Sequence, residues 1–247
     1  MLAGLQPGAI LNFDPPPSTL QVTTRPNYFF VPMDREIVDL LVRFFVLTVS
    51  LSVHEFAHAW SAFRLGDDTA ARMGRMTLNP VSHMDPIGSM MILAGMPLGW
   101  AKPVPVDPSR LRNPLRHGSW VAFAGPLSNI VLGFAFALVF WVASFQAIGT
   151  GWFLLLIYFI QINFALAIFN LLPLPPLDGA RVVPLFMPAR TAERYEAFID
   201  KLGYWPLLAL FLLELPPSFK GPLHLWFELW SPLFQPTLNY LGVPSFW

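Results

Sequence analysis

Three long apolar stretches constrain the fold of this chain more than any other feature. They cover Ile37–Leu65, Ser119–Ala147 and Trp152–Leu172. A helix rises about 1.5 Å per residue, so about 20 apolar residues cross the hydrocarbon core of a bilayer. Charged residues make up only 12% of the chain, whereas soluble domains carry roughly 25%. The sequence therefore predicts an all-α membrane protein, a polytopic helical bundle.

The remaining segments divide the chain into three regions. Residues 1–33 are rich in proline, which predicts a poorly ordered or surface-lying N-terminal lead-in. Residues 34–200 hold the three long stretches and a short apolar piece, Ile87–Leu98. This piece is too short to span, so we expect a re-entrant or hairpin segment. Residues 201–247 hold two weaker, proline-interrupted stretches, expected either to span the membrane or to lie in its interface.

Basic residues place both ends of the short apolar piece on the same side of the membrane. Loops rich in Lys and Arg face the cytoplasm. Both flanks of the piece are basic, through Arg64, Arg72, Arg75, Lys102, Arg110, Arg112 and Arg116. The uncharged loop at residues 148–151 is expected outside, and basic residues between 181 and 201 return the chain to the cytoplasm. The first long helix therefore starts outside and ends inside.

Composition excludes several classes of function. The formal net charge is zero and no basic run occurs, so nothing indicates a nucleic-acid partner. The chain has no cysteine, which excludes disulfides, thiolate metal sites and cysteine nucleophiles. Any transition metal must therefore be bound by His, Asp or Glu side chains.

The sequence HEFAH, residues 54–58, carries the strongest chemical signal. Residues four apart lie on one face of a helix, which lets the imidazoles of His54 and His58 reach one zinc ion. Glu55 lies beside this face and can reach a water molecule at the metal as general base. Two buried histidines with structural hydrogen bonds are the alternative. Because polar groups in a transmembrane stretch are costly and mark function, we interpret the motif as a zinc site.

A catalytic zinc site needs a third protein ligand besides His54 and His58. Carboxylates near the membrane are candidates, as are the other histidines, His83, His117 and His224. Asp178 is the best candidate, because the predicted topology places it on the same side of the membrane as the HEFAH pair. An ordinary turn aspartate before Gly179 is the alternative.

Together these motifs resemble the site-2 protease family of intramembrane zinc metalloproteases. The resemblance rests on HEFAH in one transmembrane stretch and NLLPLPPLDG, residues 170–179, at the end of a later one. It extends to GRMTLNPVSHMDPIGS (74–89), GWAKPVPV (99–106) and AGPLSN (124–129). It covers roughly residues 37–200, so we expect an intramembrane metalloprotease core at 34–200. The pattern is similar to that of compact bacterial and archaeal members without an inserted PDZ domain.

The resemblance implies a three-helix catalytic core in which His54, His58 and Asp178 bind one zinc ion per chain. It implies that Glu55 is the catalytic glutamate and that the enzyme cuts peptide bonds in or near transmembrane segments of membrane-protein substrates. The chain would lie in the lipid bilayer of a bacterial or archaeal cell, with its active site towards the cytoplasmic side. A membrane protein that handles or transports zinc, or an inactive membrane scaffold, is the alternative.

Three asparagines and a run of prolines complete the candidate residues. Asn129 and Asn163 are interpreted as interhelical hydrogen-bonding residues. Asn170, in the same motif as Asp178, is a candidate contact for the substrate backbone or an oxyanion. The prolines within residues 173–176 leave backbone groups free, and an extended substrate could pair with these groups as an added strand. A simple helix stop is the alternative for this run.

Overall fold

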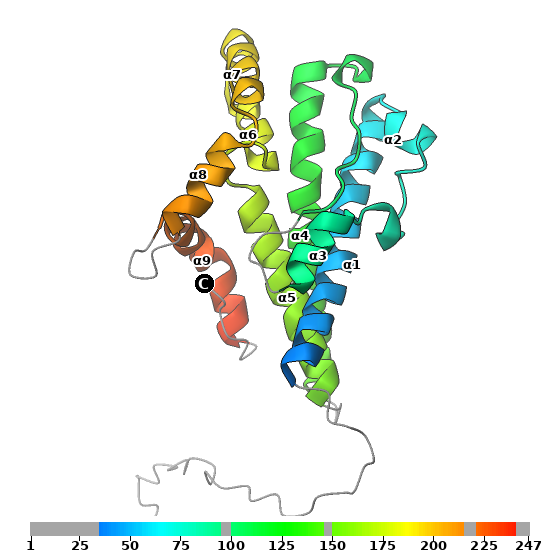
Figure 1. Cartoon of the computed structure of the whole chain (residues 1–247), viewed down its shortest axis with the longest axis vertical. Coiled ribbons are helices and arrows are strands. Elements are labelled where there is room, and N and C mark those ends of the chain that lie inside the picture. Colours follow the sequence, from blue (N-terminus) through cyan, green and yellow to red (C-terminus); the bar gives the residue numbers. More distant parts are fainter. Residues whose placement is uncertain (1–34, 95–99, 146–149, 215–220, 241–247) are drawn as a thin grey trace, which may run out of the picture. The chain divides into compact units, whose positions relative to one another are not determined.

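The computed structural model of the chain describes residues 35–94, 100–145, 150–214 and 221–240, which are mainly helical (Figure 1). The predicted lead-in at 1–33 lies outside these residues. The α-helices are α1 (Arg35–Leu65), α2 (Thr69–Arg72), α3 (Pro86–Leu93), α4 (Pro114–Ala143), α5 (Thr150–Asn170), α6 (Asp178–Val182), α7 (Ala189–Leu202), α8 (Trp205–Glu214) and α9 (Pro222–Tyr240). Short 3-10 helices are η1 (Pro80–Ser82), η2 (Pro108–Arg110) and η3 (Val183–Phe186). The described residues contain no β-strand, which confirms the all-α class.

Three of the described helices, α1, α4 and α5, are long and apolar enough to cross a membrane. They contact one another and run side by side in Figure 1, which confirms the three predicted spanning stretches. The helix α4 begins earlier than the predicted Ser119. Its start is at Pro114, because the Asn113 side chain accepts a hydrogen bond from the Arg116 amide and proline suits the first helical position.

The core of the bundle lies where small residues let the long helices approach closely. Gly133 of α4 faces Phe164 of α5, and a Cβ atom at Gly133 would lie only 2.4 Å from the Phe164 ring. Phe164 is fully buried, and its ring lies 4.4 Å from the ring of Phe234 in α9. The outward faces of α4 carry large exposed apolar residues such as Val131 and Leu138, as contact with lipid requires.

The short apolar piece contains most of α3, and the described residues on either side of this helix lie next to each other. The Asp85 side chain begins the helix by accepting hydrogen bonds from the amides of Ile87 and Gly88. An isolated antiparallel bridge joins Met84 before α3 to Ala101 after it. This arrangement agrees with the expected re-entrant or hairpin segment, and residues 95–99 lie outside the described part.

The C-terminal region packs against α5. The Trp226 indole of α9 donates a hydrogen bond of 2.7 Å to the carbonyl of Ile168, and Leu238 of α9 is fully buried. The helix α8 has 10 residues, and neither α8 nor α9 is among the described helices that are long and apolar enough to cross a membrane. The division of the chain at residues 33 and 200 stays a prediction.

Candidate metal centre

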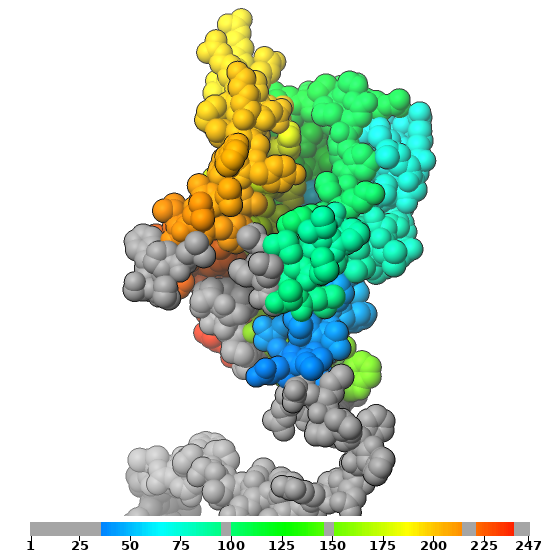
Figure 2. All heavy atoms as spheres, viewed as in Figure 1, coloured from blue at the N-terminus to red at the C-terminus, as the bar shows by residue number. Residues whose placement is uncertain are grey.

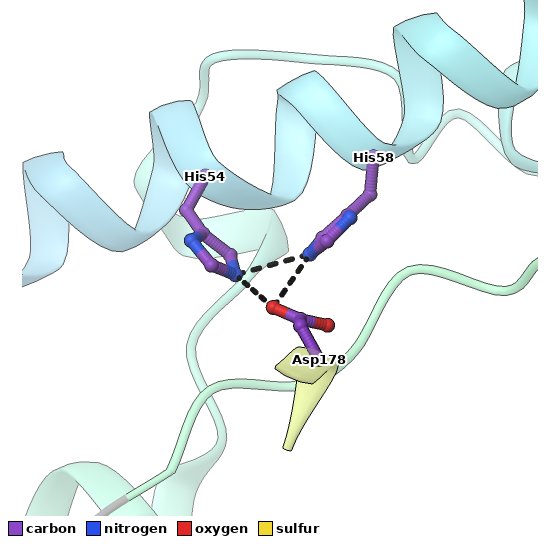
Figure 3. A group of neighbouring side chains, drawn as sticks. All are labelled: His54, His58 and Asp178. Atoms are coloured by element: carbon purple, nitrogen blue, oxygen red, sulfur yellow. Dashed lines mark hydrogen bonds and ion pairs between the residues drawn. The ribbon is translucent and has the colours of Figure 1, made fainter. Parts of the chain in front are cut away.

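His54 and His58 lie on one face of α1 and are buried in the bundle (Figure 3). Their Nε2 atoms are 3.0 Å apart, and the two rings are nearly perpendicular, at 84°. One turn of helix thus brings two imidazole nitrogens to a single point, as the HEFAH spacing predicts.

Asp178 reaches the same point from α6, of which it is the first residue. Its Oδ2 atom lies 3.0 Å from the Nε2 atom of His54 and 3.3 Å from that of His58 (Figure 3). Gly179 makes this approach possible, because a Cβ atom there would lie 2.3 Å from the carbonyl oxygen of Leu171. Only glycine therefore lets the start of α6 pack so closely on the chain that leaves α5.

The outer ring nitrogens of both histidines are held by hydrogen bonds. The Nδ1 atom of His58 lies 2.7 Å from the carbonyl oxygen of Val121, which can only accept, so this nitrogen carries the proton. The Nδ1 atom of His54 lies 2.6 Å from the Oδ1 atom of Asn129. A neutral imidazole protonated at Nδ1 keeps its lone pair at Nε2. In that form the Nε2 atoms of both histidines are free to bind a metal ion.

The donor set fits a zinc ion. Two nitrogen lone pairs and a carboxylate oxygen this close repel one another unless a cation or a proton lies among them. Zinc binds His nitrogen and carboxylate oxygen at about 2.0–2.2 Å, so two ligands of a tetrahedral zinc ion lie about 3.3 Å apart. The three separations, 3.0, 3.0 and 3.3 Å, come close to that value. Within the described part of the chain, His54, His58 and Asp178 form the one group of this kind.

A buried polar network continues from His54 into both other long helices. The Nδ2 atom of Asn129 donates a hydrogen bond of 2.8 Å to the Oδ1 atom of Asn163, and Asn163 in turn donates to the Ser50 hydroxyl at 2.9 Å. All three of these polar residues are almost fully buried. The interhelical bonding predicted for the two asparagines is present. The contact of Asn129 with His54 is an addition that the sequence did not indicate.

Gly125 brings α4 directly against the two histidines. A Cβ atom at this position would lie 2.4 Å from the Nε2 atom of His58 and 2.6 Å from that of His54. Glycine is therefore the one residue that leaves room for these two nitrogens. The sequence signal was the AGPLSN motif, whose glycine had no assigned role.

Glu55 lies beside the three-residue group in the wall of the same cavity. The cavity has a volume of about 980 Å³ and is lined by His54, Glu55, His58 and Asp178, among other residues. One carboxylate oxygen of Glu55 accepts a hydrogen bond of 2.8 Å from the backbone amide of Val104. In Figure 2 the yellow and orange α6 and α7 lie on one side of this cavity, and the green residues from 100 onwards lie on the other.

Charged side chains line the part of the cavity next to α7. Arg181 and Asp200 form an ion pair of 2.8 Å, and Glu196 lines the same wall. Burial raises the pKa of Glu196, and the charge of Arg181 opposes that shift. Three charged side chains this close together are costly to bury in hydrocarbon. This part of the cavity therefore belongs at an aqueous face of the membrane.

Among Asn170 and the three remaining histidines, only the asparagine lies in the cavity wall, and the histidines lie outside the group of possible ligands. Asn170 lines the cavity, and its amide nitrogen donates a hydrogen bond of 2.9 Å to the carbonyl of Leu166. His83, His117 and His224 are not part of the three-residue group. The buried ring of His83 instead contacts the Thr77 carbonyl at 2.8 Å, which agrees with a structural loop histidine.

Comparison with known proteins adds an independent observation. The model of peptidase family M50 matches residues 140–213. YwhC of Bacillus subtilis is 40% identical over 205 residues, which cover 78% of this chain and 92% of YwhC. Rip2 of Mycolicibacterium smegmatis is 29% identical over 203 residues, which cover 78% of this chain and 73% of Rip2. Both relatives carry the name "Putative zinc metalloprotease". The chain belongs to peptidase family M50.

Membership in peptidase family M50 confirms the resemblance to site-2 proteases. The chain is a metalloprotease for which zinc is the supported metal, and its three apolar helices make it a membrane protein. No solved structure matches the chain.

Proposed function

We propose that this enzyme cuts peptide bonds in or near transmembrane segments of other membrane proteins, using one zinc ion per chain. In this proposal His54, His58 and Asp178 bind the metal and Glu55 is the catalytic glutamate. The observation that carries the proposal is that these four side chains line one cavity. His54, Glu55 and His58 come from the apolar helix α1, and Asp178 comes from α6, which follows the apolar helix α5. A site at such a depth favours substrates that also lie in the membrane.

The roles of the residues follow from their atoms. A zinc ion held by His54, His58 and Asp178 would act as a Lewis acid on the scissile carbonyl and would lower the pKa of the attacking water towards about 7. The carboxylate of Glu55 takes a proton as the water oxygen bonds to the carbonyl carbon. Glu55 then gives that proton to the amide nitrogen as the carbon–nitrogen bond breaks. The hydrogen bonds at Asn129 and Val121 hold the two imidazoles in the tautomer that this chemistry needs.

The substrate must enter the cavity in an extended form, because a helix shields its own peptide bonds. A volume of about 980 Å³ suits a short extended stretch of peptide. Asn170 and Pro176 line the cavity and are the proposed contacts for the substrate backbone. If replacing Asn170 by Ala left the cleavage rate unchanged, that contact would be wrong.

The proposed orientation places the cavity towards the cytoplasm. The charged lining near α7 belongs to a stretch with several basic residues, and basic loops face the cytoplasm. Water can therefore reach Glu55 from that side, as hydrolysis requires.

Reconstituted enzyme tests the proposal most directly. Wild type and Glu55→Gln are placed in liposomes with a library of fusion proteins, each with one transmembrane segment between two soluble domains. Cleavage sites are read by mass spectrometry, and zinc content is measured for both enzymes. We expect zinc in both and cleavage by wild type within or beside the transmembrane segment. Loss of the general base should slow cleavage by about 100-fold or more.

Other results would point away from intramembrane proteolysis. Cleavage confined to the soluble domains would contradict the proposed substrate class. Equal cleavage by Glu55→Gln would remove Glu55 from the chemistry. A protein that binds zinc but cuts nothing, with Glu55→Gln behaving like wild type in zinc uptake by the liposomes, would fit the transport alternative.

A further inference from the structure

The backbone that follows α3 contacts the catalytic glutamate directly. The amide of Val104 donates a hydrogen bond of 2.8 Å to the Oε2 atom of Glu55, which is buried. Val104 lies between Pro103 and Pro105, neither of which has an amide hydrogen. This short stretch can therefore offer Glu55 only the amide of Val104, and its position decides how Glu55 is held.

Arg75 holds the stretch just before that amide. Its Nη2 atom donates hydrogen bonds to the carbonyl oxygens of Lys102, at 2.7 Å, and Pro103, at 3.3 Å. Arg75 is buried, with 9% of the surface of the residue exposed. Its Nε atom has no hydrogen-bond partner among the described residues. A buried guanidinium with carbonyl partners is costly, so its presence indicates a use beyond packing.

Further contacts anchor the stretch at both ends. The amide of Lys102 donates to the carbonyl of His83 at 2.8 Å. The amide of Asp107 donates to the Oδ2 atom of Asp67 at 2.7 Å, and Asp67 is fully buried. Between these anchors, Arg75 is the side chain that restrains the backbone on the amino-terminal side of Val104.

We propose that Arg75 is a positioning residue for Glu55, acting through the Val104 amide. By holding the carbonyls of Lys102 and Pro103, Arg75 keeps that amide aimed at one oxygen of Glu55. The other oxygen of Glu55 is then free to exchange a proton with the attacking water. The catalytic part of this inference rests on the proposed function, whereas the coupling of Arg75 to the Val104 amide does not.

A misplaced base slows the chemical step without weakening substrate binding, because the base acts on the water. Arg75→Met keeps the length and apolar stem of the side chain but removes its donors. Val104→Pro removes the amide hydrogen that contacts Glu55. Arg72→Met is the matched control, because Arg72 is an exposed arginine at the end of α2, three residues before Arg75, and pairs with Asp68 instead.

Two measurements on the full-length, zinc-loaded protein in detergent test the inference. The first is hydrogen exchange of the backbone between Lys102 and Asp107, where the two prolines leave few amides to resolve. We expect the Val104 amide to exchange about tenfold faster in Arg75→Met and in Glu55→Ala, as after loss of one hydrogen bond to a charged group. Arg72→Met should exchange like wild type.

The second measurement is the steady-state cleavage of the single-span fusion that wild type cuts best. We expect kcat to fall about tenfold or more in Arg75→Met and Val104→Pro, with KM within twofold and zinc content unchanged. Arg75→Lys, which keeps one donor group, should recover part of kcat. Arg72→Met should match wild type.

Several outcomes would overturn the inference. Val104 exchange that is unchanged in Arg75→Met would show that Arg75 does not hold the amide. A higher KM at constant kcat would assign the stretch to substrate binding instead. If wild type cuts no fusion, the proposed function fails, but the exchange measurement still decides whether Arg75 controls the Val104 amide.

Discussion

At the scale of single residues, a hydrogen bond at Nδ1 of each histidine leaves Nε2 as the nitrogen available to a metal ion. For His58 this partner is a backbone carbonyl, which no substitution removes cleanly. For His54 it is the side chain of Asn129, which is buried and held by Asn163. Asn129 is therefore the place where the orientation of a ligand can be tested by mutation.

Replacing Asn129 by Leu should weaken zinc binding by about 10–100-fold, because His54 loses the group that orients its ring. Competition with a zinc-selective chelator measures the change. Ser128→Ala is the control, since Ser128 is the preceding residue and its hydroxyl bonds within α4. Equal zinc affinity in wild type and Asn129→Leu would show that Asn129 does not orient His54.

Adding one methyl group at Gly125 should also remove zinc. The new Cβ atom would lie 2.4 Å from the Nε2 atom of His58, so the imidazole must leave its present position. Gly118→Ala, in the same helix, is the matched control because a Cβ atom there meets nothing within 4 Å. Zinc content after purification checks the pair. Full zinc content in Gly125→Ala would contradict the close approach of α4.

The sequence predicted part of the grouping of the site residues. HEFAH predicts that two imidazoles meet, and this follows from helix geometry alone. Asp178 could be favoured only through topology and the family resemblance, because its distance from α1 depends on how α6 packs. Asn129 and Gly125 were beyond prediction as partners of the histidines, since their contacts depend on the rotation of α4 against α1. The zinc-binding roles themselves stay predictions.

At the scale of helices, the contact of α4 with α5 depends on Gly133. A methyl group at this position would lie 2.4 Å from the fully buried ring of Phe164. Overpacking of this kind costs about 1–3 kcal/mol, so Gly133→Ala should lower the thermal unfolding midpoint in detergent. Gly118→Ala should hold or raise the midpoint, because alanine favours a helix by about 0.5–1 kcal/mol over glycine. Equal midpoints in the two variants would contradict the packing.

Hydropathy predicted the positions of the long helices, but it did not predict the residues at which the helices begin and end. The helix α4 starts at Pro114, in a polar segment, because the cap at Asn113 is a local hydrogen bond that hydropathy does not register. Similarly, α3 begins at Pro86, one residue before the apolar piece, and ends at Leu93 within it. The packing of α9 on α5 rests on tertiary contacts that no local pattern indicates, among them the hydrogen bond of Trp226 and the ring contact of Phe234 with Phe164.

At the scale of the whole molecule, the proposed cytoplasmic orientation of the active site can be tested with single cysteines. The chain has no native cysteine, so each variant carries one thiol. Met73 lies exposed in the loop after α2, and Ser144 lies exposed at the end of α4. In intact cells, a membrane-impermeant maleimide should label Ser144→Cys but not Met73→Cys, which should react only after permeabilisation. The reverse pattern would invert the proposed topology.

The central claim is that α1 and α6 together hold one zinc ion. Metal content of the protein purified in mild detergent, without chelators, tests it by comparing wild type with Asp178→Ala. We expect about one zinc ion per chain in wild type, and a marked loss in the variant because a catalytic zinc site keeps three protein ligands. Absence of zinc from wild type, or full zinc content in Asp178→Ala, would contradict the account.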